Sequence, residues 1–164
     1  MKVPGGILVI LFLLMAAQGI YYYPRMPGTM ATHFDKEGNA RDWMMKTEFF
    51  IVYTSMTVFF AALFLVLPPA ACKSKGFRIG GRWDSDNSPE DRAKSVSRFM
   101  RILMWMGAGT VGLVGGIAYL TFQANLFPGY RFFDPARILT FGYFAYMFFW
   151  LIGFLWSQWR RKGG

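Results

Sequence analysis

The chain has little of what disulfide-linked and ion-coupled proteins use. Its 164 residues include one cysteine, Cys72, and one histidine, His33. A single cysteine excludes an intramolecular disulfide, and we expect Cys72 to be a small packing residue. Charged residues make up only 16% of the chain, whereas hydrophobic residues make up 54%. Because a soluble domain of this length cannot bury so much apolar surface, the composition predicts an integral membrane protein.

Charge is absent from four long apolar runs, none of which contains Asp, Glu, Lys, Arg or His. The runs cover about residues 4–23, 49–67, 102–122 and 138–156. Each has about 20 residues, which at about 1.5 Å per residue cross the ~30 Å hydrocarbon core. We therefore expect a single membrane domain, 1–164, folded as an all-α bundle of four transmembrane helices. Its connections are two outer loops and one inner loop, at about 24–48, 123–137 and 68–101.

The distribution of basic residues predicts the orientation of this bundle. With the N-terminus inside, the cytoplasmic face carries 12 of the 18 Lys and Arg residues. This excess places both termini in the cytoplasm of a multi-pass membrane protein. The same face would attract anionic lipid headgroups, at roughly 1 kcal/mol per basic residue. The high pI thus follows from topology, and no nucleic-acid partner is predicted.

Just before the third run, Asn87-Ser88-Pro89-Glu90-Asp91 combines a capping residue, a proline and acidic residues. This combination is typical of a helix N-terminus. Apolar residues then recur at helical spacing toward the span. We expect an amphipathic helix that starts near Pro89, lies along the inner surface and leads into the third span.

The third run contains a motif that matches GxGxxG, from Gly107 to Gly112. A dinucleotide site needs a strand before these glycines and an acidic residue about 20 positions later, and the sequence has neither there. No cofactor is therefore predicted. Ala108, Gly112 and Gly116 instead recur every four residues, which favours close helix packing within the bundle or in a homo-oligomer.

The first outer loop holds the polar run Thr32-His33-Phe34-Asp35-Lys36-Glu37-Gly38. Prolines such as Pro27 hold the preceding chain extended. We expect a turn at residues 35–39, in which Gly38 takes a positive φ. Trp43 follows at the membrane interface.

These residues resemble the N-terminal domain of SdpI-like bacterial membrane proteins, a domain of unknown function. The shared pattern is Pro-x-x-aliphatic-Pro-Thr-His-Phe-Asp-x-x-Gly, followed by an aromatic residue and a lysine. The residues that fall on it are Pro27, Met30, Thr32, His33, Phe34, Asp35, Gly38, Trp43 and Lys46. Ala31 stands where the family usually has proline. The resemblance implies a protein of the bacterial plasma (inner) membrane that acts as an immunity factor against a secreted peptide toxin and also holds a transcriptional repressor at the membrane.

Three uses of the loop remain open. His33, Asp35 and Glu37 offer one nitrogen and several oxygens to a metal, although structural zinc sites usually have more Cys or His ligands. His33 can instead hydrogen-bond within the loop or to the second outer loop, with Phe34 against the span ends. Alternatively, the loop recognises an extracellular peptide, a lipid headgroup or a membrane protein.

No nucleophile with a suitable partner is predicted on the outer face, so we expect no enzyme activity. Two functions follow. One is an SdpI-like protein that binds a toxin peptide or envelope ligand, and the other is a structural accessory subunit of a larger membrane complex.

Overall fold

The computed structural model describes residues 2–66, 89–127 and 129–159. Its elements are α1 (Lys2–Tyr22), η1 (Tyr23–Arg25), β1 (Thr29–Phe34), β2 (Ala40–Met45), α2 (Lys46–Ala61), η2 (Ala62–Val66), α4 (Pro89–Leu126) and α5 (Phe133–Trp159). Cys72 and most of the expected inner loop lie outside the described residues. The predictions for Cys72 and for this loop therefore stay predictions.

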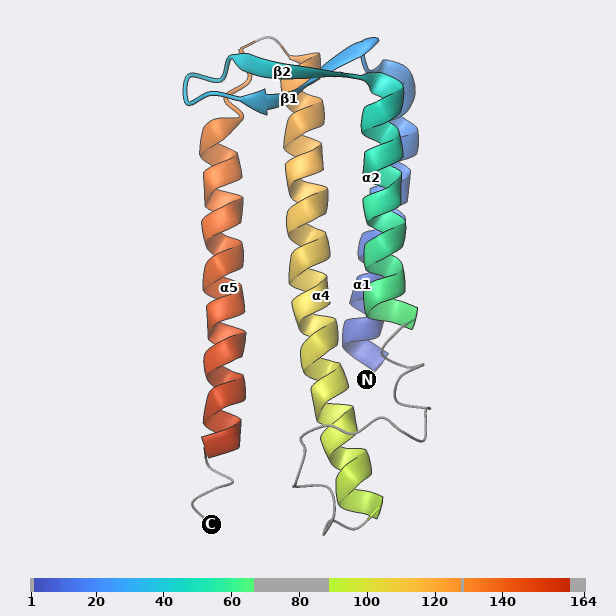
Figure 1. The fold of residues 1–164 in the computed structure, drawn as a ribbon, viewed down its shortest axis with the longest axis vertical. Coiled ribbons are helices and arrows are strands. Elements are labelled where there is room, and N and C mark those ends of the chain that lie inside the picture. Colours follow the sequence, from blue (N-terminus) through green and yellow to red (C-terminus); the bar gives the residue numbers. More distant parts are fainter. Residues whose placement is uncertain (1, 67–88, 128, 160–164) are drawn as a thin grey trace.

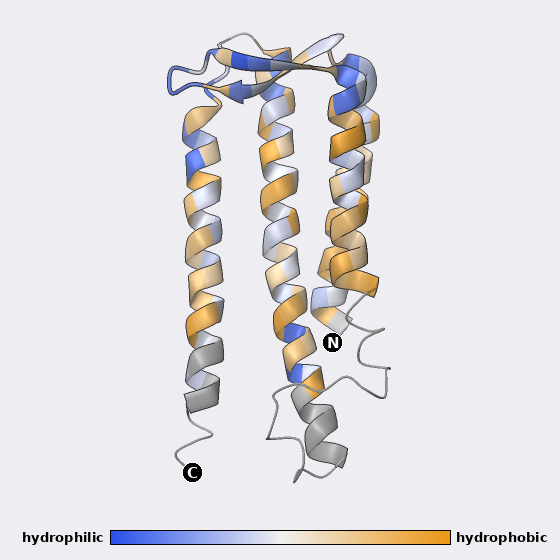
Figure 2. Cartoon of the chain, in the orientation of Figure 1, coloured by the Kyte–Doolittle hydropathy of each residue, from blue (hydrophilic) through white to orange (hydrophobic). Residues whose placement is uncertain are grey.

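Four helical segments are long and apolar enough to cross a membrane, as the sequence predicts. They are Val3–Arg25, Lys46–Val66, Val96–Leu126 and Phe133–Gly153. Figure 2 shows hydrophobic residues along all of them and hydrophilic residues at the strands. The strands cap one end of the bundle, while α1 begins and α5 ends at the opposite end (Figure 1). The chain therefore has the architecture of a multi-pass membrane protein.

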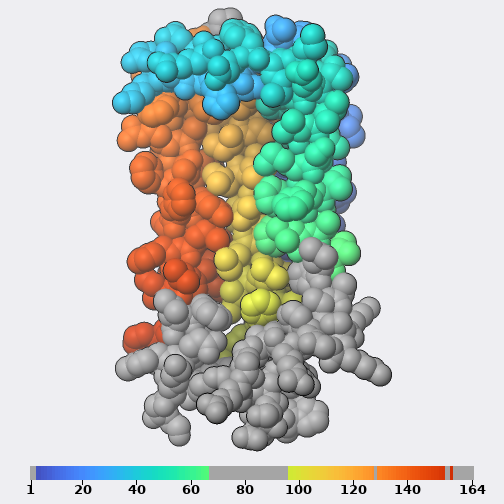
Figure 3. All heavy atoms as spheres, in the orientation of Figure 1, coloured from blue at the N-terminus to red at the C-terminus, as the bar shows by residue number. Residues whose placement is uncertain are grey.

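The structure corrects the all-α prediction at the first outer loop, which is a β-hairpin. β1 pairs antiparallel with β2, from Thr29 opposite Met45 to Phe34 opposite Ala40. In Figure 3 this hairpin lies across the end of the bundle, over α4 and α5. The chain leaves α1 through the short 3-10 helix η1, which contains Pro24, before it becomes extended at Met26.

The helix that starts at Pro89 is confirmed, but it is continuous with the third span. α4 runs uninterrupted over 38 residues to Leu126. Its first turns continue close to the direction of the span and do not turn aside to lie across the end of the bundle (Figure 1).

α1, α2 and α4 pack together, and their contact near the hairpin is aromatic. Phe122 of α4 is fully buried and stacks on Tyr22 of α1, with ring centroids 4.7 Å apart. It also stacks on Phe50 of α2 at 5.5 Å and meets the edges of Phe49 and Tyr53. Each such pair contributes about 0.5–1.5 kcal/mol beyond its buried area. This cluster fixes the ends of three helices directly beneath the hairpin.

Polar groups within the spans satisfy one another, because lipid offers no hydrogen bonds. The Tyr53 hydroxyl of α2 donates to the Met15 carbonyl of α1 at 2.7 Å. Gln18 of α1 donates to the Gly115 carbonyl of α4 at 3.4 Å. Between α4 and α5, the Tyr146 hydroxyl donates to the Trp105 carbonyl at 2.6 Å. These hydrogen bonds join neighbouring helices. They matter because apolar contact alone hardly favours helix–helix association over contact with lipid.

The small residues of α4 do not act as one stripe. Ala108 is buried, Gly116 lies against Leu139 of α5, and Gly112 has open space where a Cβ would be. The closest contacts occur at glycines outside the predicted set of three. A Cβ at Gly107 would overlap the ring of Phe64, and one at Gly109 would overlap the ring of Tyr146.

We therefore expect Gly109→Ala to lower the stability of the bundle by about 1–3 kcal/mol, since the new methyl group displaces the Tyr146 ring. Gly112→Ala is the matched control on the same helix. It should leave stability within about 0.5 kcal/mol of the parent chain. Thermal unfolding in one detergent measures both, and equal melting temperatures for the two variants would contradict this assignment of contacts.

Candidate functional site: the hairpin at the end of the bundle

The predicted turn at residues 35–39 closes the hairpin, and Gly38 has the expected positive φ of 90°. The Asp35 amide donates to the Asn39 carbonyl at 2.9 Å, and the Gly38 amide donates to the Asp35 carbonyl at 3.1 Å. The Asp35 carboxylate accepts bonds from the backbone and the side-chain amide of Asn39, at 2.8 and 3.2 Å. These Asn39 bonds lower the pKa of Asp35 below its ordinary value of 3.8.

His33 is paired within the hairpin. Its Nδ1 lies 3.2 Å from a carboxylate oxygen of Asp42 on β2 and 3.3 Å from the Thr32 hydroxyl. Thr32 also donates to the Asp42 carbonyl at 3.4 Å. The His33 and Asp42 side chains are 74% and 70% exposed. A contact between side chains this exposed contributes at most about 1 kcal/mol, so it orients the two side chains more than it stabilises the hairpin.

The pairing register shifts between Ala31 and His33, and again between His33 and Phe34. Such bulges bend a strand and redirect side chains. They bring His33 opposite Asp42.

The weak metal candidates are not gathered into a site. The Asp35 carboxylate is used by Asn39, and His33 is directed at Asp42. Glu37 is exposed in the turn. Within residues 2–66, 89–127 and 129–159, no group of three or more His, Cys, Asp or Glu side chains could hold a metal ion.

The remaining motif residues hold the hairpin in place or face solvent. Phe34 stacks on Phe132 of the second outer connection, with centroids 4.6 Å apart, as expected for a ring against the span ends. The turn approaches the same connection, since a Cβ at Gly38 would lie 3.7 Å from the Tyr130 carbonyl oxygen. Pro27 is exposed, and Trp43 is 62% exposed.

One residue that sequence reasoning missed ties the hairpin to the bundle. Asn125, in the last turn of α4, accepts a hydrogen bond from the Ala31 amide at 2.7 Å and donates to the Ala31 carbonyl at 2.9 Å. It also donates to the Thr121 carbonyl of its own helix at 2.9 Å. The side-chain amide thus pairs with β1 as a neighbouring strand would. A lone Asn at the end of an apolar span was the available signal.

This contact depends on the amide hydrogen of Ala31. Proline has no amide hydrogen, so a proline at this position could not donate to Asn125. Ala31 is also 3% exposed, which leaves its backbone no access to water. Here alanine permits a bond that proline would forbid.

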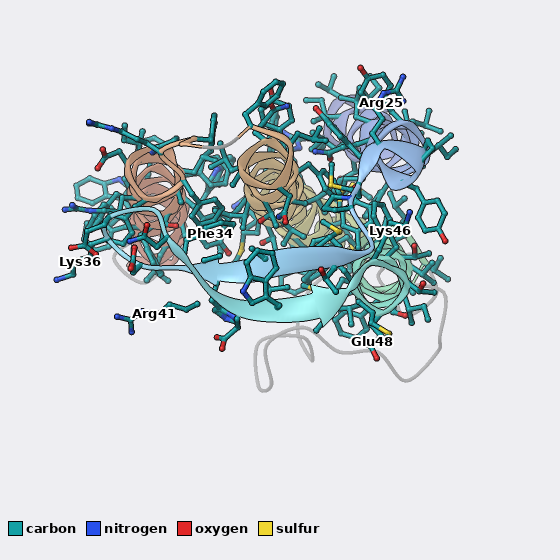
Figure 4. All side chains as sticks on the ribbon, turned by 90° about the horizontal axis from the view of Figure 1, so that it is seen from above. Arg25, Phe34, Lys36, Arg41, Lys46 and Glu48 are labelled. Atoms are coloured by element: carbon teal, nitrogen blue, oxygen red, sulfur yellow. The ribbon has the colours of Figure 1, made fainter. Side chains whose placement is uncertain are left out.

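The same contact defines the free edge of the hairpin. Because the Ala31 amide and carbonyl point at Asn125, the Ala31–Trp43 pair has no hydrogen bonds of its own. The Lys46 amide donates to the Gly28 carbonyl at 2.9 Å, so the Gly28–Lys46 pair is hydrogen-bonded. Hydrogen-bonded and non-hydrogen-bonded pairs therefore alternate along the two strands. The amide and carbonyl of Trp43 and, by alternation, the amide of Met45 therefore point away from β1, while the Met45 carbonyl belongs to the N-cap of α2. Figure 4 shows β2 on the outer side of the sheet, with β1 between it and α4.

Residues 10–57 match the family model of a domain of unknown function, DUF1648, which occurs in SdpI-like membrane proteins. The matched segment runs from α1 through η1 and the hairpin into α2. No curated protein and no solved structure matches the chain. The match supports the resemblance for this segment, and α4 and α5 lie outside it.

We expect Asn125→Leu to detach β1 from α4, because it leaves the buried amide and carbonyl of Ala31 unpaired. The cost is about 1–3 kcal/mol for the docked hairpin. Asn125→Asp keeps the acceptor but turns a carboxylate oxygen toward the Ala31 and Thr121 carbonyls, so it should weaken docking as well. Hydrogen exchange at Thr29–Phe34 measures both variants, and unchanged protection in Asn125→Leu would refute the contact.

The turn should respond to acid. Since folding lowers the pKa of Asp35, its carboxylate stabilises the turn fully above about pH 3.8 and loses this contribution as the pH falls through the lowered pKa. The amide chemical shift of Asn39 should move in that acid range. In Asp35→Asn it should stay constant, and a similar titration in both forms would assign the change to another group.

Proposed function

We propose that the chain is an SdpI-like integral membrane protein without catalytic activity, which binds a toxin peptide or envelope ligand through its outer loops. In this proposal it lies in the bacterial plasma membrane with both termini in the cytoplasm. The hairpin then faces outward, and the basic inner face contacts anionic lipid headgroups. The excess of Lys and Arg on one side supports this orientation.

The observation that carries the proposal is the open outer edge of β2. Trp43 turns its backbone amide and carbonyl away from β1, as Met45 does its amide, and both side chains are 62% exposed. An unpaired strand edge is a template for another strand, which is why proteins usually cover such edges. Here β1 is covered by α4 through Asn125, whereas β2 is uncovered among the residues that the structure describes.

Strand addition is a general way to bind an extended peptide. Backbone hydrogen bonds supply the affinity, and alternate side chains along the edge supply the specificity. On β2 these are Arg41 and Trp43, a positive charge beside an aromatic ring. A short extended peptide of mixed polarity suits this edge.

The proposal predicts that Trp43→Pro abolishes protection against a peptide toxin. Proline removes the outward amide at a position that makes no bond to β1, so the hairpin itself should persist. Trp43→Val is the matched control, since it removes the ring and keeps the amide. Survival is measured in cells that carry each variant and are exposed to peptides secreted by the source organism.

Parent-level survival with Trp43→Pro, or no protection by the parent chain, would contradict the proposal. Hydrogen exchange of β1 in both variants confirms that the hairpin has formed.

The exposed aromatic face of α5 favours the second candidate, a structural accessory subunit. No residue of the apolar segment Phe133–Gly153 in α5 is buried within the chain. Phe141, Phe148 and Phe149 are 66%, 64% and 73% exposed. If a larger complex covers this face, Phe148→Ala should weaken co-purification of that complex in mild detergent, and Trp43→Pro should not.

A further inference from the structure

An apolar groove lies on the outside of the bundle, between α1 and α2. Its volume is about 900 Å³, within the usual range for ligand sites. It is lined by Ala16, Gly19, Ile20, Tyr23, Thr47, Phe50, Ile51, Tyr53, Thr54, Thr57 and Val58. All of these except Val58 belong to the segment that matches the family model. The groove runs along the half of the spans nearest the hairpin.

Small residues on α1 keep this groove open. Ala16 contributes one methyl group and Gly19 none. A Cβ at Gly19 would lie 3.2 Å from the ring of Tyr53, so the glycine lets the two helices approach while the space beside them stays empty. The walls are mainly apolar, which suits a hydrocarbon chain.

The end of the groove near the hairpin is cationic. Tyr23 and Thr47 line that end, and the Lys46 ammonium lies 5.0 Å from the centroid of the Tyr23 ring. Lys46 also donates to the Met26 carbonyl at 3.4 Å. No carboxylate pairs with Lys46 in the described parts of the chain. Figure 4 places Glu48 on the opposite side of α2, so it does not neutralise this end.

We propose that the groove binds one phospholipid with an anionic headgroup, from the leaflet on the hairpin side. An acyl chain lies between α1 and α2, and the headgroup phosphate meets Lys46. The charge of Lys46 and the apolar walls of the groove select this occupant, because an ammonium at headgroup level attracts anionic lipid. This site is separate from the edge of β2 and holds whether or not a peptide binds there.

The test uses the purified full chain in mild detergent with equal amounts of phosphatidylglycerol and phosphatidylcholine of identical acyl chains. Native mass spectrometry counts the lipid that the protein retains. We expect one retained phosphatidylglycerol, favoured over phosphatidylcholine by about fivefold, the factor for one basic residue near the headgroup. Lys46→Gln should abolish the preference, and Lys46→Arg should keep it.

Filling the groove should remove the lipid itself. The double variant Ala16→Leu, Thr54→Leu places new side chains where the acyl chain lies, and it should lose retention of both lipids. Gly142→Leu is its control, because it likewise adds a leucine side chain, but into the open space beside Gly142 on α5. Arg137→Gln is the control for Lys46→Gln. It removes another positive charge that lies close to the hairpin end of its helix, here α5.

Equal retention of the two lipids by the parent chain would overturn the proposal. So would a preference that survives Lys46→Gln, or retention that survives the double variant. A melting curve for each variant establishes that it has folded, and Lys46→Gln tests the site even if the double variant does not fold.

Discussion

The hydrogen bonds between the Asn125 amide and the backbone of Ala31 are the contact on which the hairpin end of the protein depends. An isolated two-stranded hairpin is marginally stable in water. Here one strand is bonded to a helix whose end is already fixed by the stacking of Phe122 on Tyr22 and Phe50. The stacking of Phe34 on Phe132 holds the turn end of the same hairpin. The hairpin is therefore a rigid cap, and its remaining exposed edge has a defined position.

The membrane as solvent explains why the contacts within the spans differ from those of a soluble bundle. Threonine hydroxyls return to carbonyls of their own helix, as Thr57 does to Tyr53. Longer polar side chains cross between helices, as Tyr146 does to Trp105. Glycine is used where a ring must come close, at Gly109. Because lipid covers the remaining apolar surface at no cost, α5 can pack on α4 and leave most of its other side chains outward.

The spans, the start of α4 and the turn at Gly38 could be predicted, since each depends on local composition or on one backbone preference. The hairpin could not, because Thr29–Phe34 lacks a regular alternation of apolar and polar residues and its register contains bulges. Asn125 and Ala31 are 94 positions apart, so no local pattern connects them. The spacing of Ala108, Gly112 and Gly116 indicated a packed face of α4, but periodicity does not say which neighbour each residue meets.

Lys46 joins the two proposed binding surfaces. Its amide continues the strand ladder to Gly28, directly after the free edge of β2, while its ammonium stands at the end of the groove beside Tyr23. The backbone of this one residue thus belongs to the hairpin and its charge to the membrane interface. A peptide on β2 and a lipid between α1 and α2 would therefore meet the same short segment from two sides. This geometry gives the family-matching segment, which contains the hairpin and nearly all of the groove, a physical reason to act as one unit.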